Sequence, residues 1–264
     1  MIDLHIHSVY SDGTCTIDEI IDIAKELNLS QIAITDHNNL EGSIAAHERT
    51  DIDSAIGIEI TTEYEKAEIH LLGYFLNGSK SNYESVRFIL KEAEARKRIA
   101  TVETIENLNA AGIDISVNEL KEFTRGTINR VHICKAMMKH GYINSVNEGF
   151  AKYVGDDCPA YVEAERVSLA EATEAIHSDG GIAVIAHPYE YVDSLNIWDF
   201  LDANIDMVDG IECFHPSATS EQSKMLVKYA NKHSKIITGG SDFHGDNKPD
   251  VLLGMMNVDD KYRI

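Results

Sequence analysis

The sequence has little positive charge: 23 lysines and arginines stand against 44 aspartates and glutamates, for a formal net charge of −21. This deficit argues against a broad surface for duplex DNA, which proteins bind through clustered cations. It does not exclude an anionic substrate, because bound divalent metal ions can reverse the sign of the local field. No apolar run approaches the length that a bilayer-spanning helix needs, so we expect no membrane partner.

Paired cysteines and a leader are also absent from the sequence. The four cysteines lie far apart without a CxxC pair, as is typical of reduced thiols in a cytoplasmic protein. Asp3, His5 and His7 interrupt any apolar run near residue 1, so we expect no signal peptide. The apolar fraction of 44% is that of an ordinary globular chain, and 264 residues can bury a full core.

Short apolar segments alternate with amphipathic helical patterns in two parts of the chain, residues 1–76 and 166–264. We predict about seven strands there, at 1–4, 31–34, 55–60, 68–74, 182–186, 208–211 and 235–238. Repeated β/α units of this kind indicate a parallel sheet or barrel. Helical patterns dominate residues 77–165, beginning with a long helix over 86–108. We interpret this stretch as a helical insertion subdomain, a lid, between two parts of the barrel.

The first predicted strand runs directly into two histidines, His5 and His7. Because side chains alternate between the faces of a strand, both imidazoles point to the same side. A bare pair of this kind is more often a surface feature than a ligand pair. Here Asp12 follows on a Ser-Asp-Gly turn that can fold its carboxylate back over the strand end. The three residues are therefore candidate metal ligands.

Further ligand-type side chains lie at or near the ends of the other predicted strands, where barrel enzymes place their reactive groups. The full set is His5, His7, Asp12, His37, Glu59, His70, His187, Asp242 and His244. Core packing does not explain nine such residues, because burying an unpaired imidazole or carboxylate costs free energy. Mixed histidine and carboxylate ligands suit zinc, manganese or iron. The set is large enough for two or three divalent ions, with a carboxylate such as Glu59 bridging a pair.

Four motifs carry a resemblance to a known family. They are residues 3–8 (DLHIHS), 35–38 (TDHN), 185–188 (IAHP) and 240–245 (GSDFHG). In this order they resemble the motifs of the PHP (polymerase and histidinol phosphatase) family, which are metal-dependent phosphoesterases. The resemblance extends from residue 3 to about residue 254. It implies an irregular seven-stranded β/α barrel, with the helical insertion added to it.

The resemblance also implies how the ligands are shared among three metal sites. The first site would use His5, His7, Glu59 and Asp242; the second would share Glu59 and add His70 and His187; the third would use Asp12, His37 and His244. Some family members have histidine where this chain has Asp12. With a carboxylate oxygen in place of an imidazole nitrogen, we expect the third site to accept hard cations such as manganese more readily.

The insertion resembles that of one subgroup of the family. Residues 129–133 (NRVHI) are similar to its Gly-Arg-Pro-His element, with Asn129 and Val131 as departures, and residues 150–154, 159–162 and 210–216 continue the similarity. Members of this subgroup are similar to nucleoside 3′,5′-bisphosphate phosphatases and to exoribonucleases that trim RNA from the 5′ end. The resemblance implies that Arg130, His132 and, more weakly, His215 bind substrate phosphate. The other interpretation of Arg130 is a helix-start arginine that pairs with a nearby acid.

The implied activity is hydrolysis of phosphate esters of nucleotides, either 3′,5′-bisphosphates or the 5′ ends of short RNA, by a hydroxide that bridges the metals. Asp242, His244 and His132 are the predicted catalytic residues, and the substrate is a small phosphorylated molecule. Three alternatives stay open: a histidinol-phosphate-type or generic phosphomonoesterase, a metal-dependent amide or lactone hydrolase, and a non-catalytic metal-binding scaffold.

Overall fold

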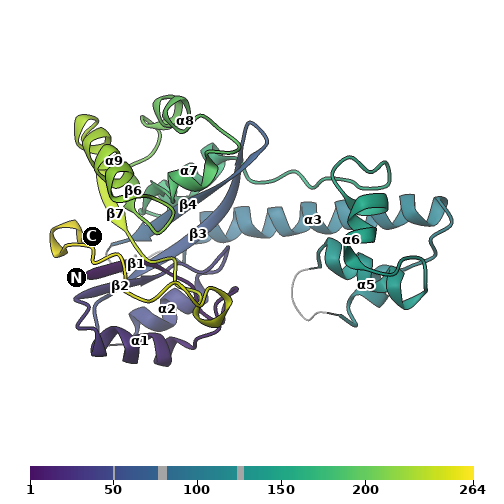
Figure 1. Cartoon of the computed structure of the whole chain (residues 1–264), viewed down its shortest axis with the longest axis horizontal. Helices are drawn as coiled ribbons and strands as arrows, with labels where there is room; N and C mark the ends of the chain where they lie inside the picture. Colours follow the sequence, from purple (N-terminus) through teal and green to yellow (C-terminus); the bar gives the residue numbers. More distant parts are fainter. Residues whose placement is uncertain (50, 77–81, 124–127) are drawn as a thin grey trace. The chain divides into compact units, whose positions relative to one another are not determined.

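The computed structural model describes residues 1–49, 51–76, 82–123 and 128–264 (Figure 1). The chain divides into two compact units. Residues Met1–Ile89 and Val167–Ile264 form one, which we call the barrel unit, and Leu90–Arg166 form the other, the helical unit. Residue 77, where the sequence places the start of the insertion, lies outside the described residues. Within those ranges, no helix is both long and apolar enough to cross a membrane.

The barrel unit is built on a seven-stranded sheet whose strands follow one another in chain order. The strands are β1 (Ile2–Ile6), β2 (Gln31–Ile34), β3 (Ser54–Tyr64), β4 (Ala67–Phe75), β5 (Ile182–Ile185), β6 (Gly210–Phe214) and β7 (Ile236–Gly239). The segment after β7 returns to β1, where His7 N–H donates to Phe243 O and Asp242 N–H donates to His5 O, both at 2.8 Å. These bonds bring the sheet close to closure. The predicted seven-stranded barrel is confirmed.

The prediction of parallel strands is wrong for β4, which pairs antiparallel with both β3 and β5. Only Glu65 and Lys66 separate β3 from β4, and both have positive φ angles, 49° and 70°. Two such residues make the tight turn whose twist matches a hairpin, so the chain reverses at once. As a result β4 begins at the end of the barrel where the parallel strands finish. His70, near the start of β4, is thereby brought to the same end as the other ligand-type residues.

Five α-helices cover the sheet, namely α1 (Ile17–Glu26), α2 (Glu41–His47), α7 (Leu169–Ser178), α8 (Ile197–Asn204) and α9 (Ser220–Lys232), with short 3₁₀ turns at Pro188–Tyr191, Gly245–Asn247 and Asp260–Tyr262. Three of these helices start at capping boxes, with Thr16, Ser168 and Thr219 as the N-cap residues. Each cap satisfies backbone N–H groups that the first helical turn leaves unpaired. Helix starts in this unit are therefore set locally, by three or four residues each.

Alternation along β2 divides its apolar residues between two clusters. Ile32 and Ile34 belong to the cluster under α1 and α2, whereas Ala33 between them packs with Leu4 and Leu72 in the barrel interior. The interior cluster is Ile2, Leu4, Ala33, Ala55, Leu72, Tyr74, Val184, Ala186 and Val258. It fills the barrel below the polar end, so the barrel is a packed core that carries a site at one end.

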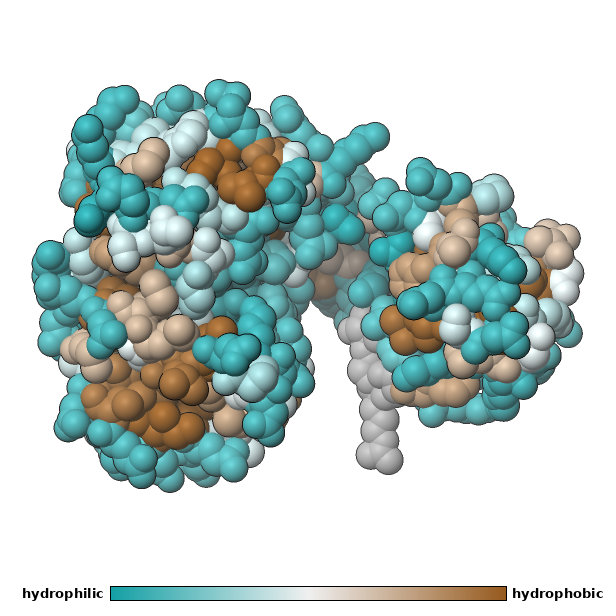
Figure 2. Space-filling model, in the orientation of Figure 1, coloured by the Kyte–Doolittle hydropathy of each residue, from teal (hydrophilic) through white to brown (hydrophobic). Residues whose placement is uncertain are grey.

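The helical unit contains most of α3 (Glu84–Ala110), followed by α4 (Val117–Leu120), α5 (Arg130–Lys139), α6 (Val146–Gly149) and a π-helical turn at Phe150–Val154. Its core is apolar and includes Leu108, Ile133 and Met137. Ser145 caps α6 by accepting from Glu148 N–H, while the Glu148 carboxylate accepts from Asn144 N–H. On the visible face, hydrophilic side chains cover much of each unit, in keeping with the charge of −21 (Figure 2).

Candidate metal centre

All nine predicted ligands lie at the same end of the barrel unit. His5, Glu59 and His70 are within β1, β3 and β4; the others follow β1, β2, β5 and β7, and they are His7, Asp12, His37, His187, Asp242 and His244. Six of the nine are buried, although imidazoles and carboxylates are rarely buried without partners. Residues from six parts of the sequence thus converge on one small volume.

The carboxylate of Glu59 is at the centre of this group. It is 1% exposed, and histidine nitrogens surround both of its oxygens. The shortest approaches are 2.9 Å from Oε1 to His70 Nδ1 and 2.9 Å to His187 Nε2. Oε2 faces His37 Nδ1 at 3.1 Å, His7 Nε2 at 3.2 Å and His5 Nε2 at 3.4 Å. A carboxylate in this position can bridge two metal ions, one on each oxygen.

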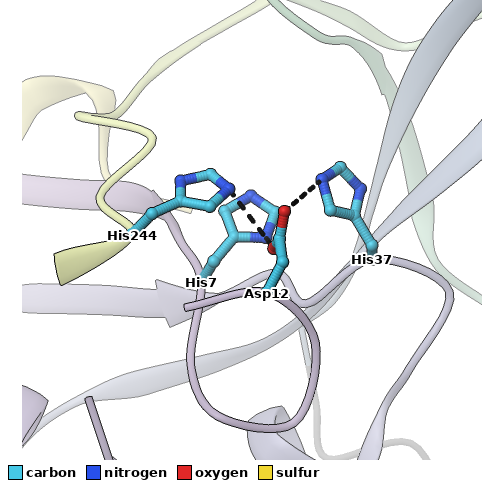
Figure 3. A group of neighbouring side chains, drawn as sticks. All are labelled: His7, Asp12, His37 and His244. Atoms are coloured by element: carbon cyan, nitrogen blue, oxygen red, sulfur yellow. Dashed lines mark ion pairs between the residues drawn. The ribbon is translucent and has the colours of Figure 1, made fainter. Parts of the chain in front are cut away.

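A second group forms around Asp12, whose side chain is about half exposed (Figure 3). Its Oδ1 lies 3.3 Å from His244 Nε2 and 3.5 Å from His7 Nδ1, and its Oδ2 lies 3.7 Å from His37 Nε2. The turn after β1 therefore folds the Asp12 carboxylate back over the strand end, as the Ser-Asp-Gly sequence predicts. His7 belongs to this group as well as to that of Glu59, so the candidate ligand groups overlap more than the three implied sets.

Asp242 turns one oxygen toward the histidines and the other away from them. Its Oδ1 lies 3.2 Å from His7 Nε2 and 3.5 Å from both His5 Nε2 and His244 Nδ1. Its Oδ2 lies 3.4 Å from His215 Nε2 and accepts a hydrogen bond from Lys248. The first oxygen is thus placed as a metal ligand. The second is available to other cations and donors.

Hydrogen bonds to Asp36 and the close approach of Gly240 to β1 fix the backbone around the predicted ligands. The Asp36 carboxylate accepts from Ser8 N–H at 2.8 Å, from Ser8 Oγ at 2.7 Å and from Ser11 Oγ at 2.6 Å, which fixes the loop that leads to Asp12. Gly240 packs directly against β1, where a Cβ would lie 2.4 Å from His5 N. Only glycine allows this approach, which puts Asp242 beside His5.

The buried atoms of the site fit divalent metal ions. Within the described residues, six side-chain atoms at this end of the barrel are buried without a hydrogen-bond partner: His5 Nε2, His7 Nε2, His37 Nδ1, Glu59 Oε2, His187 Nδ1 and His215 Nε2. Orphaned buried nitrogen and oxygen atoms are costly and are rare in folded proteins. Convergent imidazole nitrogens and carboxylate oxygens are a donor set that zinc, manganese and iron accept, so the residues present suit such ions.

The electrostatics of the site keep its central carboxylate ionised. Burial acts to raise the pKa of Glu59, but the charges of His5 and His70 outweigh it and hold that pKa well below its ordinary value. Burial likewise acts to lower the pKa of His70, yet the Glu59 charge raises it to about 10. For His37, burial dominates and lowers the pKa to about 4. A metal ion binding here finds Glu59 as carboxylate and His37 as neutral imidazole, the forms that ligate.

Glu212 is a site residue to which the sequence analysis gave no role. It lies in β6, is 1% exposed, and its two carboxylate oxygens are 3.0 and 3.2 Å from His5 Nδ1. Its Oε2 also accepts from His187 N–H at 2.8 Å. With Nδ1 engaged in this way, His5 turns Nε2 toward Glu59 and Asp242. The available signal was a carboxylate between Ile211 and Cys213 in an otherwise apolar strand.

The three predicted substrate-binding residues fall in different units. His215 lies beside Asp242 in the barrel unit, 3% exposed. Arg130 and His132 belong to the helical unit, on α5. Arg130 pairs with Asp156, and its guanidinium lies 4.7 Å from the centre of the Tyr161 ring. His132 Nδ1 accepts from Asn129 N–H at 3.0 Å, completing the N-terminal cap of the helix. Both have structural partners within their own unit.

Comparison with known proteins places these features in context. The PHP domain profile matches residues 3–175. A 5′-3′ exoribonuclease from Haemophilus influenzae is 31% identical over 249 residues, covering 92% of this chain and 89% of the relative. A 3′,5′-nucleoside bisphosphate phosphatase from Chromobacterium violaceum is 28% identical over 259 residues, covering 95% and 90%. A Bifidobacterium adolescentis crystal structure, described as that of a candidate metal-dependent phosphoesterase, matches with a TM-score of 0.71 at 30% identity, covering 99% and 93%.

Proposed function

Because the chain belongs to the PHP domain family, we propose that it hydrolyses phosphate esters of nucleotides with the help of divalent metal ions. The substrates are 3′,5′-bisphosphate nucleotides or the 5′ ends of short RNA, as the names of the two relatives suggest. The family places the chain among metal-dependent hydrolases. The observation that carries the proposal is the ring of orphaned nitrogen and oxygen atoms around Glu59.

The proposed ligand sets follow the motifs. His5, His7 and Asp242 would hold one ion, His70 and His187 a second, with Glu59 between them; Asp12, His37 and His244 would hold a third. Zinc, manganese and iron all suit this donor set, in two or three sites. When bound, such ions stabilise charge on phosphoryl oxygens and lower the pKa of water.

The side chains around the ions prepare the site for this chemistry. Glu212 fixes which nitrogen His5 offers, and Asp36 holds the loop that carries Asp12. The apolar barrel interior lies beneath the buried ligands, among them His5, Glu59 and His187, and the low local dielectric there strengthens their electrostatic interactions. Arg130 and His132 are proposed contacts to substrate phosphate, and His132 a proton donor to the leaving oxygen. The support for these two roles is the similarity of residues 129–133 to the subgroup element.

The first test is phosphate release by purified, manganese-loaded protein. Adenosine 3′,5′-bisphosphate and a 5′-phosphorylated oligoribonucleotide are compared with AMP and histidinol phosphate. We expect turnover of the bisphosphate or the oligonucleotide, abolished in Asp242→Asn. Arg130→Ala should reduce it, whereas Arg263→Ala, which also removes an arginine paired with an aspartate, should not.

Two outcomes would contradict the proposal in different ways. Rapid hydrolysis of monoesters that is indifferent to Arg130→Ala would indicate a generic or histidinol-phosphate-type phosphatase. No turnover of any phosphate ester, with metals bound, would favour the amide or lactone hydrolases.

A further inference from the structure

Asp242 Oδ2 lies between two donors that are not among the nine predicted ligands, although His215 also lies in a possible ligand group with His5 and Glu212. His215 Nε2 is 3.4 Å from Oδ2, and Lys248 Nζ donates a hydrogen bond to the same oxygen. The other oxygen of Asp242 faces His7 Nε2 at 3.2 Å. One carboxylate therefore separates the ligand nitrogens from a lysine and a histidine.

The tautomer of His215 is fixed by its own loop. Ser217 N–H, which can only donate, points at His215 Nδ1 at 3.1 Å. Nδ1 must therefore accept, and a neutral His215 carries its proton on Nε2. That N–H is buried and makes no well-formed hydrogen bond among the residues described; the Asp242 carboxylate oxygen beside it, Oδ2, lies 3.4 Å away. A buried donor held this loosely beside a candidate metal centre can take a closer, anionic partner.

Lys248 is held at this position by the loop that follows His244. Its N–H donates to Gly245 O at 3.1 Å, closing a short 3₁₀ turn. Asp246 N–H donates to Thr14 Oγ1 and Asn247 Nδ2 donates to Asp12 O, at 2.8 and 2.7 Å. The backbone of Lys248 is thus tied to the loop that carries Asp12. Its side chain remains 42% exposed, so the ammonium can reach a molecule entering from solvent.

We propose that Lys248 Nζ joins Nε2–H of His215, which the sequence already predicts to contact phosphate, in a phosphate-binding pair within the barrel unit; the pair would contact non-bridging oxygens of the substrate phosphoryl group beside the metals. This inference rests on the proposed function. Once Asp242 shares its charge with a metal ion, it attracts Lys248 less, and a phosphate oxygen becomes the stronger partner for the ammonium. The ligand class is a phosphate mono- or diester. Recognition of the reacting phosphate then comes from the barrel unit itself.

The test measures binding of inorganic phosphate to manganese-loaded protein by calorimetry, with bound manganese counted in each sample. Lys248→Met removes the charge and keeps the length of the side chain; we expect about tenfold weaker phosphate binding. Lys248→Arg should restore affinity to within about threefold of wild type, and His215→Gln should weaken it about fivefold. Lys224→Met is the matched control, since Lys224 pairs with Glu221 on α9, and should change nothing.

The manganese affinity of Lys248→Met shows whether Lys248 binds phosphate or only positions the Asp242 carboxylate. If Lys248 only holds Asp242 in place, Lys248→Met lowers manganese affinity and leaves phosphate affinity unchanged, and the proposal is overturned. Wild-type protein that binds no phosphate would overturn it as well. Phosphate binding that depends on Lys248, in a protein that hydrolyses none of the esters, would sustain the pair and reject the proposed function. Ester turnover with phosphate binding indifferent to Lys248 would reject the pair alone.

Discussion

In the barrel unit the most deeply buried residues include histidines and carboxylates, whereas the helical unit buries almost only apolar side chains. Thr104 is the one buried polar residue among the described part of the helical unit, and its hydroxyl donates to Ala100 O at 2.8 Å. In the barrel unit, by contrast, Glu59 and His5 lie at 1% and 0% exposure with atoms left unpaired. The described part of the helical unit pairs its buried polar groups within itself. The barrel unit leaves buried atoms that a bound metal ion could pair.

The two units differ in what their buried residues contribute: those of the helical unit contribute stability, and those at the polar end of the barrel offer atoms for binding. In the described part of the helical unit, no buried side-chain nitrogen or oxygen lacks a hydrogen-bond partner. The polar end of the barrel is less stable in the free protein, since unpaired buried polar atoms cost about 1–3 kcal/mol each. The metal ions of the proposed centre would offset that cost. Substitutions in the helical-unit core should therefore lower stability, whereas substitutions at the polar end of the barrel should lower metal binding and activity.

The largest effect is expected for Glu59→Gln, which removes the charge that five histidines surround. Bound metal should fall, and phosphate ester hydrolysis should drop by about 10²–10³-fold or more, the scale of losing one preorganised electrostatic group. Metal analysis and phosphate release measure both. Glu221→Gln, on exposed α9, is the control. Full metal content in Glu59→Gln would remove Glu59 from the proposed centre.

Leu108→Ala should destabilise the helical unit and leave the bound metal unchanged, the reverse of what is expected for Glu59→Gln. Leu108 is fully buried in the helical-unit core, and truncating such a side chain costs about 2–5 kcal/mol. Hydrogen exchange followed by mass spectrometry should show lost protection in residues 90–166, with unchanged metal content. Leu252→Ala, at a residue 64% exposed, should do neither. Loss of metal in Leu108→Ala would show that the units are not independent in stability.

Chelation of the metals should act on the barrel unit alone. An ion present at about 100 times its dissociation constant adds about 2.7 kcal/mol to the stability of the state that binds it. Its removal should lower the melting temperature of the barrel unit and increase exchange around β1 and β7. Residues 90–166 should keep their protection. If chelation increased hydrogen exchange equally in both units, the prediction would be wrong.

The smallest of these effects is expected for Glu212→Gln, which keeps the shape of the side chain and changes its hydrogen bonding to His5. Loss of a partner of this kind costs about 10- to 100-fold in metal affinity. Competition with a coloured chelator measures that affinity. Circular dichroism of the metal-free protein should stay unchanged, since the fold does not depend on this charge. Unaltered affinity would show that His5 needs no orienting group.

What the sequence predicts well is what local signals encode. Capping boxes at Thr16, Ser168 and Thr219 mark helix starts, and HxH, TDH and SDFH place ligand-type residues beside strand ends. The hairpin at Glu65 and Lys66 was missed because its turn lacks the usual asparagine or glycine, and so the direction of β4 was assigned wrongly. The ligand-type residues do meet at one end of the barrel unit, while their roles as ligands remain predictions.

The contacts of Glu212 and Lys248 were beyond sequence reasoning for a physical reason. Glu212 meets His5 across 207 positions, and the contact exists only because β1 and β6 take their places in a nearly closed sheet. Lys248 reaches Asp242 from a turn tied to the Asp12 loop, which periodicity cannot reveal. Arg130 illustrates the converse: its motif suggested a substrate role, and the partner the structure gives it is Asp156.

Closure of the sheet next to β1 must wait until the end of the barrel unit has been synthesised. The Asp3 carboxylate accepts from Ser241 N–H at 2.9 Å, across 238 positions, and so joins the first strand to the segment that carries Asp242 and His244. A ribosome that adds 5–20 residues per second needs roughly 12–48 s to cover that span. Until then His5 and His7 lack the neighbours that Asp242 and His244 supply. The proposed metal centre would therefore be assembled only after β7 and the segment behind it have been synthesised.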